Sequence, residues 1–178
     1  MKKITHPIYS DYPEQPYISP NRDLKEWEER PEKFPYKKVE KRQMIKTDEG
    51  LFPGDIVMLW RINFGNFTND STIPEYFEYR YGVNSDESIK RLTEKGFIEL
   101  GNVAETIDLL NMTILKRILK SEGLSTGGKK EELVDRTLEI PNKRLEELVE
   151  LRRYKITKKG SEVLKLRDDI IQRHGPKM

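Results

Sequence analysis

Residues 112–138, with the sequence MTILKRILKSEGLSTGGKKEELVDRTL, constrain the fold of this chain more than any other stretch. Thr113 precedes an apolar run and is the expected N-cap of a first helix, and Gly123 is the expected C-terminal stop. Gly127 and Gly128 open a second helix. The apolar residues recur at helical spacing and are Leu115, Ile118, Leu119, Leu133, Val134 and Leu138. The stretch therefore predicts two short helices joined by a glycine-rich turn.

The joint spacing of these residues resembles the SAP domain. The residues that carry the resemblance are Leu115-Lys116, Leu119, Gly123-Leu124, Gly128-Lys129-Lys130, Leu133-Val134 and Arg136. They fall within residues 107–140, about a fifth of the chain. The resemblance implies a helix-extended-turn-helix module of the kind found in DNA- and RNA-associated proteins. It also implies that the turn and the basic residues of the first helix face a duplex, and it raises a phage or prophage origin.

The same turn comes close to the phosphate-loop pattern GxxxxGK[ST]. Lys130 stands where Ser or Thr should bind magnesium, and the preceding segment is a charged helix instead of a buried strand, so we reject a nucleotide-binding loop. We expect instead that backbone N–H groups at the start of the second helix bind a phosphate of the nucleic-acid backbone. The expected nucleic-acid-binding residues are Lys116, Arg117, Lys120, Gly127, Gly128, Lys129, Lys130 and Arg136.

The charge distribution leaves an alternative open for this turn. Residues 107–140 carry six basic and six acidic side chains, and Glu131 and Glu132 weaken any anion affinity, so an ordinary solvated turn is the competing interpretation. The net charge of the chain is only +2, but residues 141–178 carry 11 basic and 6 acidic side chains. A bound nucleic acid is therefore expected to meet the turn and the C-terminal third.

The pattern of the whole chain predicts a mainly α fold. We divide it into an extended N-terminal arm (1–50), a helical body (51–106), the SAP-like module (107–140) and a C-terminal strand and helix that complete the body (141–178). The most hydrophobic window, Leu51–Phe64, is expected to be a buried helix, although a strand fits its continuous apolar run. A helix also starts at Ser85, and a final helix is expected from Gly160 onward. Four aromatics at helical spacing are expected to be core residues and not a base-stacking platform, namely Tyr76, Phe77, Tyr79 and Tyr81.

Two separated segments together resemble a winged helix. SIKRLTEKGFIEL predicts a helix and a strand at Phe97–Leu100, and RYKITKKGSEVL predicts a returning strand at Tyr154–Thr157 and a helix start. The resemblance implies a degenerate winged helix with a short β-hairpin, into whose wing the SAP-like module is inserted. The helix over 86–95 would normally read the major groove, but it mixes acidic and basic residues and need not touch DNA.

The N-terminal arm combines prolines with aromatic residues. Six of the ten prolines lie in residues 1–46 and favour extended backbone, with one short helix expected at Asp23–Arg30. The aromatics argue against a purely solvated tail. They are Tyr9, Tyr12, Tyr17, Trp27, Phe34 and Tyr36. We expect the arm to lie along the body of this chain or along a neighbouring copy, with a mobile tail as the alternative.

Several classes of protein are excluded by composition. Cysteine is absent, so the chain has no disulfide framework, zinc finger or thiol nucleophile. No segment approaches the roughly 18 apolar residues of a membrane span, and the N-terminus does not resemble a secretory signal. His6 and His174 lie near opposite ends of the sequence without an evident nucleophile or carboxylate partner, and no metal-ligand or catalytic motif is present. We therefore expect a cytoplasmic protein with no cofactor, no metal and no enzymatic activity.

The sequence thus predicts a non-enzymatic nucleic-acid-binding protein. Its SAP-like module is expected to contact duplex DNA phosphates weakly and with little sequence preference. The alternative is a protein-interaction or assembly module, either a phage structural or a phage regulatory component. That module would use the aromatic arm to form a homo-oligomer or to bind a phage or host protein.

Overall fold

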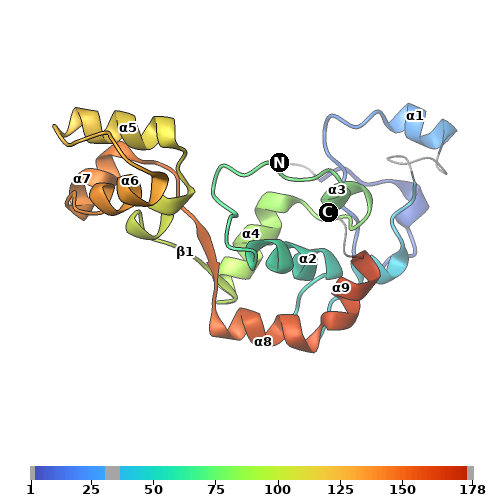
Figure 1. Ribbon diagram of the computed structural model, residues 1–178. Coiled ribbons are helices and arrows are strands. Elements are labelled where there is room, and N and C mark those ends of the chain that lie inside the picture. The colour runs from blue at the N-terminus through green and yellow to red at the C-terminus, as the bar shows by residue number, and fades with distance from the viewer. Residues whose placement is uncertain (1–2, 31–36, 176–178) are drawn as a thin grey trace. The chain divides into compact units, whose positions relative to one another are not determined.

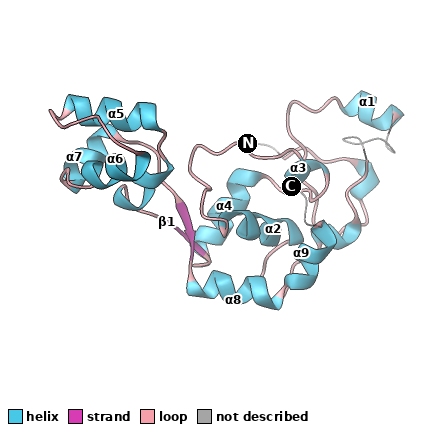
Figure 2. Ribbon diagram, viewed as in Figure 1, coloured by secondary structure: helices cyan, strands magenta, loops and turns pink. Residues whose placement is uncertain are grey.

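The computed structural model describes residues 3–30 and 37–175 (Figure 1). As predicted, the fold is mainly α, with one short antiparallel sheet of two strands (Figure 2). The arm residues Phe34 and Tyr36 lie outside the described residues. No helix within the described ranges is long and apolar enough to cross a membrane.

The elements follow one another from the arm to the last helix. In the arm and body they are η1 (Pro7–Tyr9), α1 (Leu24–Glu29), η2 (Lys41–Met44), α2 (Pro53–Ile62), α3 (Tyr76–Tyr79), α4 (Ser85–Glu94) and β1 (Ile98–Leu100). Beyond β1 they are η3 (Ala104–Leu109), α5 (Met112–Ser121), α6 (Lys130–Thr137), α7 (Asn142–Leu148), β2 (Tyr154–Ile156), α8 (Lys158–Leu166) and α9 (Asp168–His174).

The chain forms two compact units. The first comprises the described residues of Met1–Asn63, Thr72–Ile98 and Ile156–Met178, and the second comprises Phe64–Ser71 and Glu99–Lys155. The chain passes from one unit to the other at Asn63/Phe64, at Ser71/Thr72, within β1 and within β2. The winged-helix interpretation of the segments around these strands stays a prediction.

Helix α2 is the centre of the first unit and packs against α4, α8 and α9. Pro53 occupies its first turn, where a missing N–H costs nothing, and six of its apolar side chains are buried. They are Ile56, Val57, Met58, Leu59, Ile62 and Pro53 itself. The helix prediction for Leu51–Phe64 is thus confirmed over the strand alternative.

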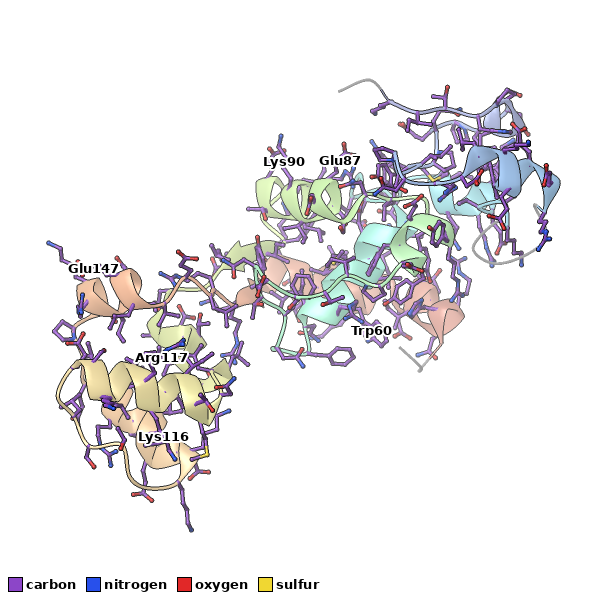
Figure 3. The ribbon with its side chains drawn as sticks, turned by 90° about the horizontal axis from the view of Figure 1, so that it is seen from above. Trp60, Glu87, Lys90, Lys116, Arg117 and Glu147 are labelled. Atoms are coloured by element: carbon purple, nitrogen blue, oxygen red, sulfur yellow. The ribbon has the colours of Figure 1, made fainter. Side chains whose placement is uncertain are left out.

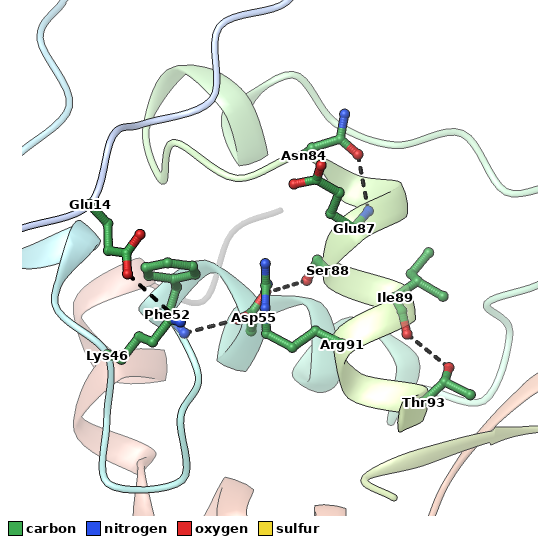
Figure 4. A network of polar contacts seen from close by, with 10 residues as sticks. All are labelled: Glu14, Lys46, Phe52, Asp55, Asn84, Glu87, Ser88, Ile89, Arg91 and Thr93. Carbon is green, nitrogen blue, oxygen red and sulfur yellow. Dashed lines mark hydrogen bonds and ion pairs between the residues drawn. The ribbon is translucent and has the colours of Figure 1, made fainter. Parts of the chain in front are cut away.

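A buried carboxylate joins α2 to α4. Asp55 is fully buried and accepts hydrogen bonds from the Phe52 N–H at 2.9 Å and from the Ser88 hydroxyl at 2.6 Å (Figure 4). Arg91 of α4 completes the set with an ion pair at 2.7 Å. Burial raises the pKa of the Asp55 carboxyl, and the charge of Arg91 acts in the opposite direction. These bonds satisfy a group that would otherwise be costly to bury.

The described part of the arm packs into the first unit. Tyr9 and Trp27 are buried and their rings stack with centroids 5.7 Å apart, while the Tyr9 hydroxyl accepts the N–H of Val39 at 3.0 Å. The short helix predicted over Asp23–Arg30 is present as α1. These contacts contradict a solvated tail. His6 also has a carboxylate partner that the sequence did not reveal, because its Nε2 lies 2.8 Å from Glu28.

Two of the four aromatics predicted to be core residues around α3, Phe77 and Tyr81, are buried, whereas Tyr76 and Tyr79 are half-buried. The expected single final helix is wrong in two respects. It begins earlier, at Lys158, because the Thr157 hydroxyl caps it by accepting the Gly160 N–H at 3.1 Å. It also ends at Leu166, and α9 starts after a non-helical Arg167 whose guanidinium pairs with Glu49 at 2.7 Å.

The second unit has its own hydrophobic core. Its buried members are Val103, Ile107, Leu110, Leu115, Ile118, Leu119, Leu133, Ile140, Leu145 and Val149. The core thus draws on η3 and on α7 as well as on the two helices of the SAP-like segment. Residues 67–69 belong to the same unit, since the Tyr154 N–H donates to the Phe67 carbonyl at 2.8 Å. This core holds the α5–turn–α6 segment in place.

Candidate nucleic-acid interface

The N-cap of helix α5 lies two residues before the expected one. The Asn111 side chain caps it by accepting the Ile114 N–H at 2.9 Å, so the assignment of Thr113 as N-cap is wrong. Asn and Thr are both favoured N-cap residues, so the sequence alone does not decide between Asn111 and Thr113. The predicted end is correct. Gly123 has a left-handed φ of 71°, and the Leu124 N–H donates back to the Leu119 carbonyl at 2.8 Å.

The two sides of α5 differ in character. Leu115, Ile118 and Leu119 are buried in the core of the second unit. Lys116, Arg117 and Lys120 are exposed, and a helical period of about 3.6 residues places them together on the opposite side. Figure 3 shows Lys116 and Arg117 on this helix. The sequence pattern therefore produces a basic outer face on α5, as the resemblance implied.

The turn between α5 and α6 depends on one of its two glycines. Gly128 has a φ of 116°, and a Cβ there would lie 2.9 Å from Glu132 Oε2. A Cβ on Gly127 would meet no heavy atom within 4 Å, so the backbone at Gly127 is open to an approaching group. Helix α6 itself starts at Lys130, with Lys129 as N-cap, two residues after the predicted opening at Gly128.

One amide of the predicted backbone anion site is already hydrogen-bonded within the chain. The Glu132 carboxylate accepts the Lys129 N–H at 3.3 Å, in the manner of the acidic half of a capping box. An incoming phosphate would have to displace this carboxylate to reach that amide. The Lys-x-x-Glu spacing in the sequence was the available signal for this cap. The side chains of Lys129 and Lys130 are exposed beside this amide.

Arg136 reaches back to the turn instead of standing free. Its Nη1 donates to the carbonyl oxygens of Ser125 at 2.7 Å and Gly127 at 2.9 Å. The side chain is half-buried, whereas Lys129 and Lys130 are exposed. Sequence reasoning placed Arg136 beside the lysines, but it contained no signal for these two hydrogen bonds.

The exposed cations of this segment are not neutralised by nearby carboxylates. Within residues 3–30 and 37–175, no carboxylate oxygen forms an ion pair with Lys116, Arg117, Lys120, Lys129 or Lys130. Some other cations of the second unit do have carboxylate partners. Arg144 pairs with Glu147 at 3.0 Å and also with Glu122, and Arg153 pairs with Asp108 at 2.7 Å.

Comparison with known proteins adds the identity of this segment. No curated protein shows significant similarity to the chain. A family model described as the SAP domain matches residues 108–138, which span α5, the turn and α6. SAP domains bind nucleic acids, DNA in particular, and are not catalytic domains. The match agrees with the residues that carried the resemblance in the sequence, and residues 108–138 of this chain are accordingly a SAP domain.

Proposed function

We propose that this protein is a non-enzymatic binder of duplex DNA that uses its SAP domain to contact backbone phosphates. The observation that carries the proposal is the set of five exposed cations on α5 and at the turn, none of them paired with a carboxylate of the described chain. An unpaired lysine loses little on meeting a phosphate, whereas a paired one must first give up its partner. The proposed contacts are Lys116, Arg117, Lys120, Lys129 and Lys130.

The open space beside the backbone at Gly127 also supports the proposal. Because the space beside its Cα is open, a sugar or phosphate can approach the main chain closely there. Gly128 acts indirectly by allowing the left-handed turn that places Lys129 at the start of α6.

The expected binding is weak and depends strongly on salt. Five phosphate contacts give a slope of log affinity against log salt of at most about −4.5 for duplex DNA. Phosphate contacts position a protein without reading bases, so the binding should tolerate changes of sequence. Glu131 and Glu132, which flank the two lysines, reduce the affinity further by repelling phosphate.

The test is a titration of labelled duplex DNA by fluorescence anisotropy at low and moderate salt. The double variant Lys129→Glu/Lys130→Glu should weaken binding at least about tenfold and make the salt slope shallower by about 1 for each lost lysine contact. The matched control is Lys25→Glu/Lys37→Glu, which changes the net charge equally at two exposed sites in the first unit, outside the C-terminal third. No wild-type binding at low salt, or equal losses in both variants, would refute the proposal.

Competition with a duplex RNA of the same sequence compares the two nucleic acids directly. If RNA displaces the DNA at equal concentration, the contacts do not distinguish the two backbones. The assembly alternative rests on the aromatic arm, and the burial of Tyr9 and Trp27 of that arm within this chain favours DNA binding over it.

A further inference from the structure

Arg136 is the one basic residue of the SAP domain whose guanidinium is already engaged at the turn. A single nitrogen, Nη1, bridges the carbonyl oxygens of Ser125 and Gly127 at 2.7 and 2.9 Å. These residues precede the start of α6 by a few positions, and Arg136 lies in its last turn. The side chain therefore connects the loop that precedes α6 to the last turn of α6.

The turn is held at a second point by Glu132, which accepts the Lys129 N–H. Gly128, between these two points, has the left-handed φ of 116° that lets the chain reverse into α6. The carbonyls of Ser125 and Gly127 are turned toward Arg136, and the chain direction at Lys129 follows from that arrangement. Lys129 and Lys130 thus extend from backbone that is fixed on both sides.

We propose that Arg136 is a positioning residue for nucleic-acid binding: it fixes the turn that presents Lys129 and Lys130 and does not itself contact phosphate. This inference rests on the proposed function and changes the part that Arg136 plays in it. Holding a binding loop in its bound conformation raises affinity because less conformational entropy is lost on binding. Arg suits the task because its planar fork presents several N–H donors in fixed directions, whereas Lys carries a point charge.

The two possible roles of Arg136 predict different losses of DNA affinity when Arg136 is replaced together with other residues. If Arg136 positions the turn, its replacement matters only while the lysines of the turn are present. Arg136→Gln should then weaken duplex DNA binding by about tenfold in the wild-type background and in Lys116→Ala. In Lys129→Ala/Lys130→Ala the same replacement should have almost no effect. If Arg136 contacts phosphate, its loss should be similar in all three backgrounds.

The salt dependence supplies a second readout. A positioning role predicts that Arg136→Gln leaves the slope of log affinity against log salt unchanged, whereas loss of a direct contact reduces it by about 1. Lys143→Gln is the control for charge. Lys143 is exposed in the same unit, and its replacement by Gln also removes one positive charge. It should change the affinity by less than Arg136→Gln does.

Amide hydrogen exchange in the free protein tests the positioning itself without DNA. Exchange at Gly127, Gly128 and Lys129 should accelerate in Arg136→Gln, while Leu133 and Thr137, which are fully buried on α6, stay protected and report that the domain is folded. Arg136→Lys, which keeps the charge, should show intermediate exchange and intermediate affinity. Unchanged exchange in the turn, or additive losses of affinity in all backgrounds, overturns the positioning role alone. Absence of wild-type binding overturns the proposed function and this role together.

Discussion

The Tyr81 hydroxyl lies 2.6 Å from Nδ1 of His174, in a buried site between the end of α3 and the last turn of α9. His174 is only 8% exposed and its ring also contacts the rings of Trp60 and Tyr76, with centroids 5.5 and 4.9 Å away. Burial lowers the pKa of His174 below its ordinary value, and the charges of Arg80 and Arg61 lower it further. The imidazole is therefore neutral at pH 7 and shares a hydrogen bond with the Tyr81 hydroxyl.

This site predicts that the protein loses stability in mild acid. Because the folded pKa of His174 lies below the unfolded value of about 6.5, the unfolded chain binds more protons in this range. The contribution of His174 is full above that value and declines as pH falls from about 6.5 toward the folded pKa. Urea unfolding of wild type and His174→Asn across this range is the measurement. The decline should be smaller in the variant, and equal declines would show that other groups cause it.

The Asp55 network predicts a large cost for a single truncation. Asp55→Ala leaves the Arg91 guanidinium, the Ser88 hydroxyl and the Phe52 N–H without their acceptor in a buried place. The free energy of unfolding should fall by about 3–5 kcal/mol, as for other broken buried ion pairs. Asp86→Asn, at an exposed position in the first turn of α4, is the control and should change it by about 0.5 kcal/mol or less. Similar values for the two variants in urea unfolding would contradict the assignment.

The two glycines of the turn should respond differently to alanine. Gly128→Ala forces a side chain into a left-handed backbone and against Glu132, which should destabilise the protein by about 1–3 kcal/mol. Gly127→Ala places its methyl group in open space and should leave the thermal unfolding midpoint nearly unchanged. If duplex DNA approaches the backbone at Gly127, this stable variant should still bind more weakly. Equal unfolding midpoints for the two variants would show that the turn does not require glycine at position 128.

Leucines of α6 and its C-cap provide a test of the SAP-domain core. Leu133 is fully buried, so Leu133→Ala should lower the free energy of unfolding by about 2–5 kcal/mol. Leu138, at the end of the same helix, is 43% exposed, and its replacement by alanine should cost less than about 1 kcal/mol. Chemical denaturation of both variants decides the matter, and a larger loss at Leu138 would contradict the described burial.

The sequence allowed the helices of the SAP domain to be located because their signals are local. Leu115, Ile118 and Leu119 repeat at helical spacing, and Gly123 ends the helix where only a left-handed residue continues the chain. The start of α5 was misplaced because Asn111 and Thr113 are both good caps and only the backbone decides between them. The single final helix was wrong for a related reason, since the break at Arg167 has no glycine or proline to mark it.

Local sequence patterns could not predict contacts between side chains that are distant in the sequence. Arg136 is 11 residues from Ser125, and His174 is 93 residues from Tyr81. Nothing in the spacing of either pair indicates contact. Local periodicity and capping chemistry in the sequence alone determined the mainly α fold, the SAP helices and the basic outer face of α5. The tertiary structure alone decided that Arg136 binds the turn and that Tyr9 and Trp27 of the arm are buried, because each outcome depends on which groups the packed chain brings within hydrogen-bonding or van der Waals distance.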